Sequence, residues 1–186
     1  MFRILIGFGV VLGSLLMAAG VTVSAQDTVK LAGNHPTDIA EASTGHIAPE
    51  RVLTMAVTLK LRNQAELNRL LSEQQDPSSL NYRRWLTPQE FSTRFGPDPS
   101  RMKAVKEWLA EQGFEVVSSS LERRSITFKG SAALAERVFE TKILTYGDGS
   151  SYANETDPSV PARFEGVIGA ITGLDNTAHA MPLSTR

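Results

Sequence analysis

The chain has 186 residues, a formal net charge of −1 at pH 7 and a hydrophobic fraction of 41%. This length and hydrophobic fraction are sufficient for one globular domain with a core, and they argue against a disordered chain. The near-neutral charge excludes the basic excess that is typical of nucleic-acid-binding domains. The absence of cysteine excludes disulfides, thiol nucleophiles and thiolate metal sites.

The N-terminus has the pattern of a signal peptide. Arg3 supplies a positive charge, an uncharged apolar stretch follows up to Ala19, and Val23-Ser24-Ala25 precedes the polar Gln26. This order predicts export and cleavage between Ala25 and Gln26, so that residues 1–25 contact a membrane only transiently. The alternative is an uncleaved anchor, although glycines within the stretch make it a weak spanning segment. We expect the mature protein to be periplasmic or extracellular.

The first elements of the mature chain are an extended lead-in and a strand. Residues 26–50 mix Gly, Pro, Asn and Thr without a sustained period, which predicts extended structure. From Leu53 to Leu61, apolar residues alternate with small or polar ones, which predicts a β-strand with one face on the core. Its opposite face presents Thr54, Ala56 and Thr58, whose side chains are small and neutral.

Helices are predicted after this strand. Asn63 followed by Glu66 predicts a capping box for a helix that ends near Gln75. Thr87-Pro88-Gln89-Glu90 predicts a second helix start, because it combines a capping threonine, a proline at the first helical position and a glutamate at the third. This second helix is expected to end at Phe95-Gly96.

A third helix is predicted from Pro97-Asp98-Pro99-Ser100 to a stop at Gly113. Its apolar residues between Met102 and Leu109 lie on one helical face, which predicts burial of that face. Trp85, ahead of the second helix, and Trp108, in the third, both lie among regularly spaced apolar neighbours. Both are therefore predicted to be core residues.

The second half of the chain predicts a mixture of strands and one helix. The elements are strands at 114–119 and 125–129, a helix capped by Ser131, a strand at 142–146, a hairpin turn at Asp148-Gly149 and a last strand at 167–174. The order of types is strand, helices, strand, strand, helix, strand. It predicts an α+β fold: a ferredoxin-like split βαβ arrangement with one antiparallel sheet, helices on one face and an enlarged first crossover.

The sequence predicts no catalytic, cofactor or metal site. His35, His46 and His179 are not spaced as metal ligands, and neither a Gly-x-Ser-x-Gly nor a His-Glu-x-x-His motif occurs. The loop at 147–150 lacks the alternating acidic residues of a calcium site and is better explained as a hairpin tip. Asn154-Glu155-Thr156 is a glycosylation sequon in a host that adds such glycans. On the residues alone we expect a secreted binding or accessory domain.

Four sets of motifs are distributed over about residues 30–176. They are Leu31-Ala32-Gly33-Asn34-His35-Pro36; Asp76-Pro77-Ser78-Ser79 with Tyr82, Trp85-Leu86-Thr87-Pro88 and Phe91; Phe95-Gly96-Pro97; and Gly173-Leu174-Asp175-Asn176. Together they resemble the activation region, or pro-region, of bacterial secreted serine peptidases of the sedolisin (kumamolisin-like) family. The central set is the most specific part of the resemblance.

The resemblance implies a ferredoxin-like pro-domain at 51–176 that assists the folding of an acid-active serine peptidase and inhibits it until acidic processing. The family's catalytic domain uses a Ser-Glu-Asp triad with an oxyanion-site aspartate and binds calcium. No residue here matches those sites, so no catalytic residue or calcium ligand is carried over. The implied partner is a cognate sedolisin catalytic domain, in cis or in trans, and not a nucleic acid. Residues 177–186 are expected to be a linker toward that domain, which this chain lacks.

The expected partner-facing residues are Thr54, Ala56, Thr58 and Asn176. Release of a peptidase in acid would require carboxylates that are charged in the complex, and Glu66, Glu90, Glu122 and Asp157 are the ones considered for this role. The sequence does not choose among them. Two alternatives stay open: a free-standing adhesion or ligand-binding module, and a peptidase inhibitor that acts in trans.

Overall fold

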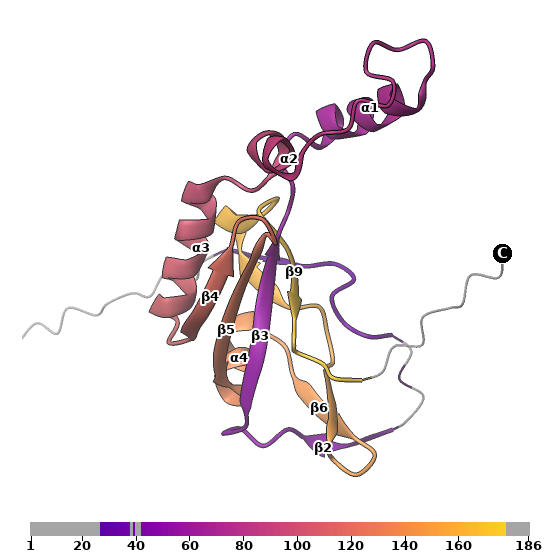
Figure 1. Ribbon diagram of the computed structural model, residues 1–186. Coiled ribbons are helices and arrows are strands. Elements are labelled where there is room, and N and C mark those ends of the chain that lie inside the picture. The colour runs from indigo at the N-terminus through magenta and orange to yellow at the C-terminus, as the bar shows by residue number, and fades with distance from the viewer. Residues whose placement is uncertain (1–26, 38, 40–41, 178–186) are drawn as a thin grey trace, which may run out of the picture.

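A computed structural model describes residues 27–37, 39 and 42–177 (Figure 1). The predicted signal-peptide cleavage site at Ala25 and Gln26 lies outside the described residues. Helices and antiparallel strands are combined in one α+β fold, as the sequence predicts. Within the described residues, no helix is both long enough and apolar enough to span a membrane.

The helices are α1 (Gln64–Gln75), α2 (Pro88–Phe95), α3 (Pro99–Glu111) and α4 (Ala132–Phe139), with a short 3-10 helix η1 (Ala162–Phe164). The strands are β1 (Thr28–Lys30), β2 (Ser43–His46), β3 (Val52–Leu59), β4 (Glu115–Ser120), β5 (Ser125–Ser131), β6 (Ile143–Tyr146), β7 (Ser151–Asn154), β8 (Ser159–Pro161) and β9 (Ile168–Thr172).

The main sheet has four strands in the order β4-β5-β3-β9, and every neighbouring pair is antiparallel. Strand β5 lies between β3 and β4, so the crossover through α1, α2 and α3 joins two strands that are not neighbours. The expectation of a single sheet is wrong. The predicted strand at 142–146 is β6, which pairs with β2 and β7 in a second sheet, while β1 and β8 form a third. Strand β9 takes the fourth place in the main sheet.

The core lies between the main sheet and the helices α3 and α4. The alternation in β3 buries Leu53, Met55, Val57 and Leu59 to 2% exposure or less. A cluster of aromatic rings extends this core from the sheet to both helices: Trp108, Phe114, Phe128 and Phe139, with Phe114 and Phe128 centroids 5.0 Å apart. Edge-to-face ring pairs of this kind contribute about 0.5–1.5 kcal/mol each beyond their buried area.

The lead-in is part of the domain. Residues 26–50 were expected to be extended, and their described part contributes the strands β1 and β2, whose hydrogen-bonding partners are β8 and β6. Leu31 and Ile47 are buried in the main core. The Leu31 amide donates to the Pro158 carbonyl at 2.9 Å, which continues the β1–β8 pairing. These partners are more than 90 residues away along the chain, so local sequence patterns carry no signal for them.

A pair of helices projects from the end of the sheet at which β3 stops (Figure 1). We call residues 61–96, which contain α1, α2 and the loop between them, the arm. It has a small apolar core of its own, separate from the main core. The residues of this second core are Leu67, Leu70 and Phe95, with Leu61, Leu86 and Phe91 packed against them.

The two predicted helix starts in the arm have different outcomes. The capping box at Thr87 is confirmed: its hydroxyl accepts from the Glu90 amide at 3.2 Å, and the Glu90 carboxylate accepts from the Thr87 amide at 2.8 Å. The prediction of a capping box at Asn63 is wrong. Asn63 has a left-handed backbone (φ 54°), and its side-chain amide donates to the Arg94 carbonyl instead. Glu66 is drawn away from the helix start by an ion pair with Arg94 at 2.6 Å.

Candidate partner-binding face

Helices α3 and α4 cover one face of the main sheet and leave the other uncovered. On this open face, Thr54, Ala56 and Thr58 are partly or fully exposed, as the alternation in the first strand predicts. The strand register extends the set across the sheet, because Ala56 lies between Thr127 and Thr172. We define the open face as Val52, Thr54, Ala56 and Thr58 with Glu115, Ser118, Ser120, Ser125, Thr127, Lys129, Ala170 and Thr172.

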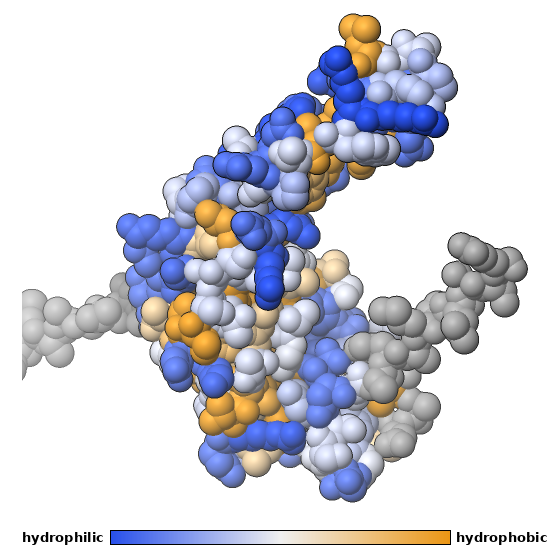
Figure 2. All heavy atoms as spheres, viewed as in Figure 1, coloured by the Kyte–Doolittle hydropathy of each residue, from blue (hydrophilic) through white to orange (hydrophobic). Residues whose placement is uncertain are grey.

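The open face is nearly free of charge. Its only charged residues are Glu115 and Lys129, which are directly opposite each other on the neighbouring strands β4 and β5. Val52 adds an apolar side chain that is 67% exposed. Figure 2 shows the surface over β4, β5 and β3 as mostly pale and orange, with a few blue groups among and beside these colours. Neutral hydroxyl and methyl groups cost much less to remove from water than charged groups do, so this face is suited to contact with another protein surface that supplies hydrogen-bonding partners.

Asn176 is not part of the open face. Its side-chain oxygen accepts from the Tyr152 amide at 2.6 Å, and its side-chain nitrogen donates to the Ser150 carbonyl at 3.1 Å. Its own backbone amide donates to the Tyr152 carbonyl at 2.9 Å. Asn176 thus fastens the chain after β9 to the edge of β7, and it is separated from Thr54, Ala56 and Thr58.

Asp157 and residues 33–35 form a hydrogen-bonded cluster that we call the clasp. The Asp157 carboxylate accepts from the Gly33 amide at 3.1 Å and from the Asn34 amide at 2.6 Å, and His35 Nδ1 lies 2.7 Å from Asp157 Oδ1. Burial by itself would raise the pKa of Asp157. The hydrogen bonds from His35, Asn34 and Gly33 outweigh burial and hold that pKa below its usual value.

The Asn34 side chain continues the clasp to the main sheet. Its oxygen accepts from the Ile171 amide at 2.6 Å, and its nitrogen donates to the Ile171 carbonyl at 2.7 Å. The Asn34 carbonyl accepts from the Asn154 side chain at 2.8 Å. Asn34 was noticed in the sequence only as part of a motif, and its role as a bridge between the lead-in and β9 was missed. The motif at residues 31–36 was the sequence signal that could have pointed to this role.

The other carboxylates considered for a pH response are placed differently. Glu66 is paired with Arg94, as described above. Hydrogen bonds from Thr87 in the capping box lower the pKa of Glu90. Glu122 is exposed in the turn between β4 and β5, and within the described residues it has neither an ion pair nor a side-chain hydrogen bond.

Polar residues elsewhere have structural roles. The turn at 147–150 is a hairpin tip between β6 and β7, as predicted, with the Gly149 amide donating to the Tyr146 carbonyl at 3.0 Å. Asn154 of the sequon is buried, and its amide nitrogen donates to Asn34 and Thr156 carbonyls, so the folded chain does not present it for glycosylation. In the part of the chain that the structure describes, no three His, Asp or Glu residues form a group that could hold a metal ion.

Comparisons with known proteins match this chain to pro-regions of serine peptidases. The family described as "Pro-kumamolisin, activation domain" matches residues 41–177. Sedolisin from Pseudomonas sp. (strain 101) is 28% identical over 148 residues, which cover 78% of this chain and 24% of the relative. Xanthomonalisin from Xanthomonas sp. (strain T-22) is 30% identical over 153 residues, 81% of this chain and 18% of the relative. The chain therefore spans less than a quarter of the length of these relatives.

Proposed function

The chain belongs to the pro-kumamolisin activation domain family, and on this basis we propose that it is the pro-domain of an exported sedolisin-type serine peptidase and has no peptidase activity itself. Its role is to assist the folding of a cognate catalytic domain, in cis or in trans, and to inhibit it until acidic processing removes the pro-domain. The relatives that share the match are several times longer than this chain, which is consistent with a part that works on a larger peptidase portion.

The observation that carries this proposal is the open face. A pro-domain that inhibits and templates a folded enzyme needs a rigid surface that loses little on desolvation. The open face meets this requirement, because a packed core supports it from behind and small neutral side chains line it. Thr58 lies between Ser125 and Ala170 near one end of the face, so a large charged side chain at this position would obstruct a docked partner.

The proposal is tested by binding and inhibition of mature xanthomonalisin and mature sedolisin at pH 7. The full chain is expected to inhibit at least one of them, and Thr58→Arg is expected to weaken inhibition at least tenfold. Arg137→Glu, on the exposed side of α4, reverses a charge on the helix-covered side of the sheet and serves as the control. Circular dichroism and thermal unfolding establish that both variants fold.

Inhibition is also expected to weaken as the pH falls from about 6 to about 4, the range in which carboxylates of a complex titrate. A carboxylate that gains a cationic or hydrogen-bonding partner in the complex has a lowered pKa there, so its contribution is lost on acidification. Glu122, which has no such partner within the described chain, is available for this role. Equal inhibition at pH 7 and pH 4 would contradict acidic release. A chain that inhibits neither peptidase would favour an adhesion module.

A further inference from the structure

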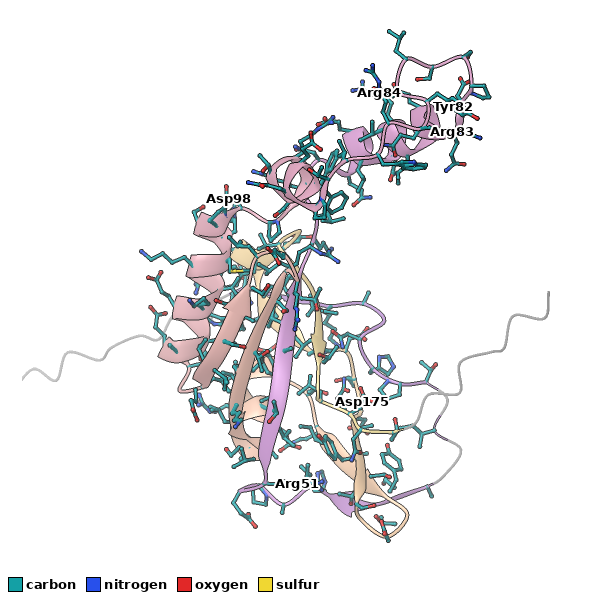
Figure 3. All side chains as sticks on the ribbon, in the orientation of Figure 1. Arg51, Tyr82, Arg83, Arg84, Asp98 and Asp175 are labelled. Atoms are coloured by element: carbon teal, nitrogen blue, oxygen red, sulfur yellow. The ribbon has the colours of Figure 1, made fainter. Side chains whose placement is uncertain are left out.

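The far end of the arm exposes a large aromatic and a large aliphatic side chain. Trp85 is 69% exposed and Leu80 is 92% exposed, so the prediction that Trp85 is a core residue is wrong. Trp108, by contrast, is 3% exposed, as predicted. We call Leu80, Arg83, Arg84 and Trp85 the tip. Figure 3 shows Arg83 and Arg84 at the end of the arm, far from the main sheet. Tryptophan is highly buried on average, and it is enriched among the residues that dominate the binding energy at the centres of protein interfaces.

The loop that carries the tip is well supported by hydrogen bonds. The buried Gln74 binds two successive residues of the loop: its carbonyl accepts from the Arg83 amide at 3.1 Å, and its side-chain amide donates to the Arg84 carbonyl. Asn81 donates to the Glu73 carboxylate at 2.7 Å, and Asp76 accepts from Ser78. The exposure of the tip therefore belongs to an ordered loop, and little conformational entropy would be lost when it binds.

The tip also carries two positive charges. Within the described residues, neither Arg83 nor Arg84 has a carboxylate within ion-pair distance, whereas Arg69 on α1 lies 3.7 Å from Glu73. The Arg83 guanidinium lies over the Tyr82 ring, 5.0 Å from its centroid. An apolar anchor beside two uncompensated cations is complementary to an apolar pocket that is flanked by carboxylates.

The size of the open face provides an independent reason for a second contact. Four strands about 4.8 Å apart, with a longest strand of eight residues at about 3.3 Å each, give a face of roughly 500 Å². Stable and specific interfaces bury about 800 Å² on each partner. The flat outline of the open face is thus modest for an interface of this kind, which favours further contact area elsewhere on this chain.

We infer that the tip is a second docking element for the catalytic domain, with Trp85 entering an apolar pocket flanked by carboxylates on that domain. The inference rests on the proposed function, because it assigns the same partner to both contacts. Two weak contacts on one pro-domain act together, because formation of one contact raises the effective concentration for the other.

The test compares dissociation constants for catalytically inactivated mature xanthomonalisin and sedolisin at pH 7. Trp85→Ala is expected to weaken binding of the full chain at least tenfold. The double variant Arg83→Ala/Arg84→Ala is expected to weaken it severalfold at low salt and to lose most of the salt dependence. Leu71→Ala, which truncates another exposed apolar side chain of the arm outside the tip, is the matched control.

A spectroscopic readout separates docking from a change in folding. The chain has two tryptophans, so labelling with 5-fluorotryptophan gives two fluorine NMR resonances. Addition of unlabelled peptidase is expected to shift the Trp85 resonance and to remove its sensitivity to D₂O, while the buried Trp108 resonance serves as the internal reference. Vesicles of phosphatidylcholine and phosphatidylglycerol are the comparison probe, since an aromatic tip with two arginines also suits a lipid surface.

The outcomes distinguish this inference from the proposed function. If the full chain binds neither peptidase, the proposed function fails and the inference fails with it. If Thr58→Arg weakens binding while Trp85→Ala binds like the unaltered chain, the inference alone fails. A Trp85 resonance that responds to vesicles and not to peptidase would also overturn the inference and assign the tip to membranes.

Discussion

Asp157 fastens the lead-in to the rest of the domain through one carboxylate. Three groups from residues 33–35 converge on its two oxygens. The sequence identified Asp157 as a titratable residue of interest, but it could not identify its partners, which are more than 120 residues away. Sequence patterns around a residue predict contacts with residues nearby in the chain. The clasp could not be predicted in this way, because it is formed entirely by long-range contacts.

We predict that Asp157→Asn destabilises the domain by about 1–3 kcal/mol at pH 7, because one of the two acceptor oxygens is replaced by a donor that faces the Gly33 amide. The lowered pKa of Asp157 means that its stabilisation is fully present above the unfolded pKa and is lost as pH falls through the folded pKa, below about pH 4. The difference between the variant and the unaltered chain should therefore shrink from pH 7 to pH 3.

Urea unfolding followed by circular dichroism at several pH values measures this difference. Glu122→Gln is the control, since Glu122 has no hydrogen-bonding partner to lose in the described chain. A constant effect of Asp157→Asn from pH 7 to pH 3 would show that the carboxylate charge does not contribute.

At the scale of elements, local signals predicted most helix boundaries. Thr87 and Ser131 begin α2 and α4 as predicted, because their hydroxyl groups accept from backbone amides three residues later. Asn63 carried the same signal and failed, since a tertiary contact with Arg94 competes for its side chain. Trp85 failed for a related reason: apolar spacing indicates which residues share a face, but not whether another element covers that face.

The arm has a core of its own, and the rest of the domain, which we call the body, contains the main core. We predict that the arm and the body also have separable local stabilities. Thr87→Ala removes half of the capping box and should destabilise α2 by about 1 kcal/mol. Hydrogen exchange should accelerate in the arm while amides of β3 and β5 keep their protection. Ser131→Ala is the matched control, because the cap it removes lies in the body. Equal acceleration in both parts after Thr87→Ala would show one cooperative unit.

At the scale of the whole molecule, the α+β class followed from the order of elements, but the division into sheets did not. Strands β2 and β6 pair across about 100 residues, and β1 and β8 across more. The lead-in has no apolar periodicity because each of its strands is short and most of their residues are exposed. Its burial at Leu31 and Ile47 depends on surfaces supplied by the other end of the chain.

We predict that the lead-in contributes substantially to global stability. Leu31→Ala should lower the free energy of unfolding by about 2 to 4 kcal/mol, because Leu31 is buried in the main core and its truncation leaves a cavity. Leu80→Ala makes the same chemical change at an exposed site and should stay within about 0.5 kcal/mol of the unaltered chain. Denaturant unfolding of the three proteins gives the comparison, and similar midpoints for all three would mean that the lead-in is dispensable.

The bridge that Asn34 makes to β9 has a consequence for solubility. An edge strand with free amide and carbonyl groups is a template for strand addition and for aggregation. At β9, the Asn34 side chain occupies both the amide and the carbonyl of Ile171, in place of another strand. At the opposite edge, the register of β4 shifts between Val116 and Ser118, and such a bulge twists an edge away from new partners. The sheet thus offers a face to a partner while neither of its edges favours growth into a fibril.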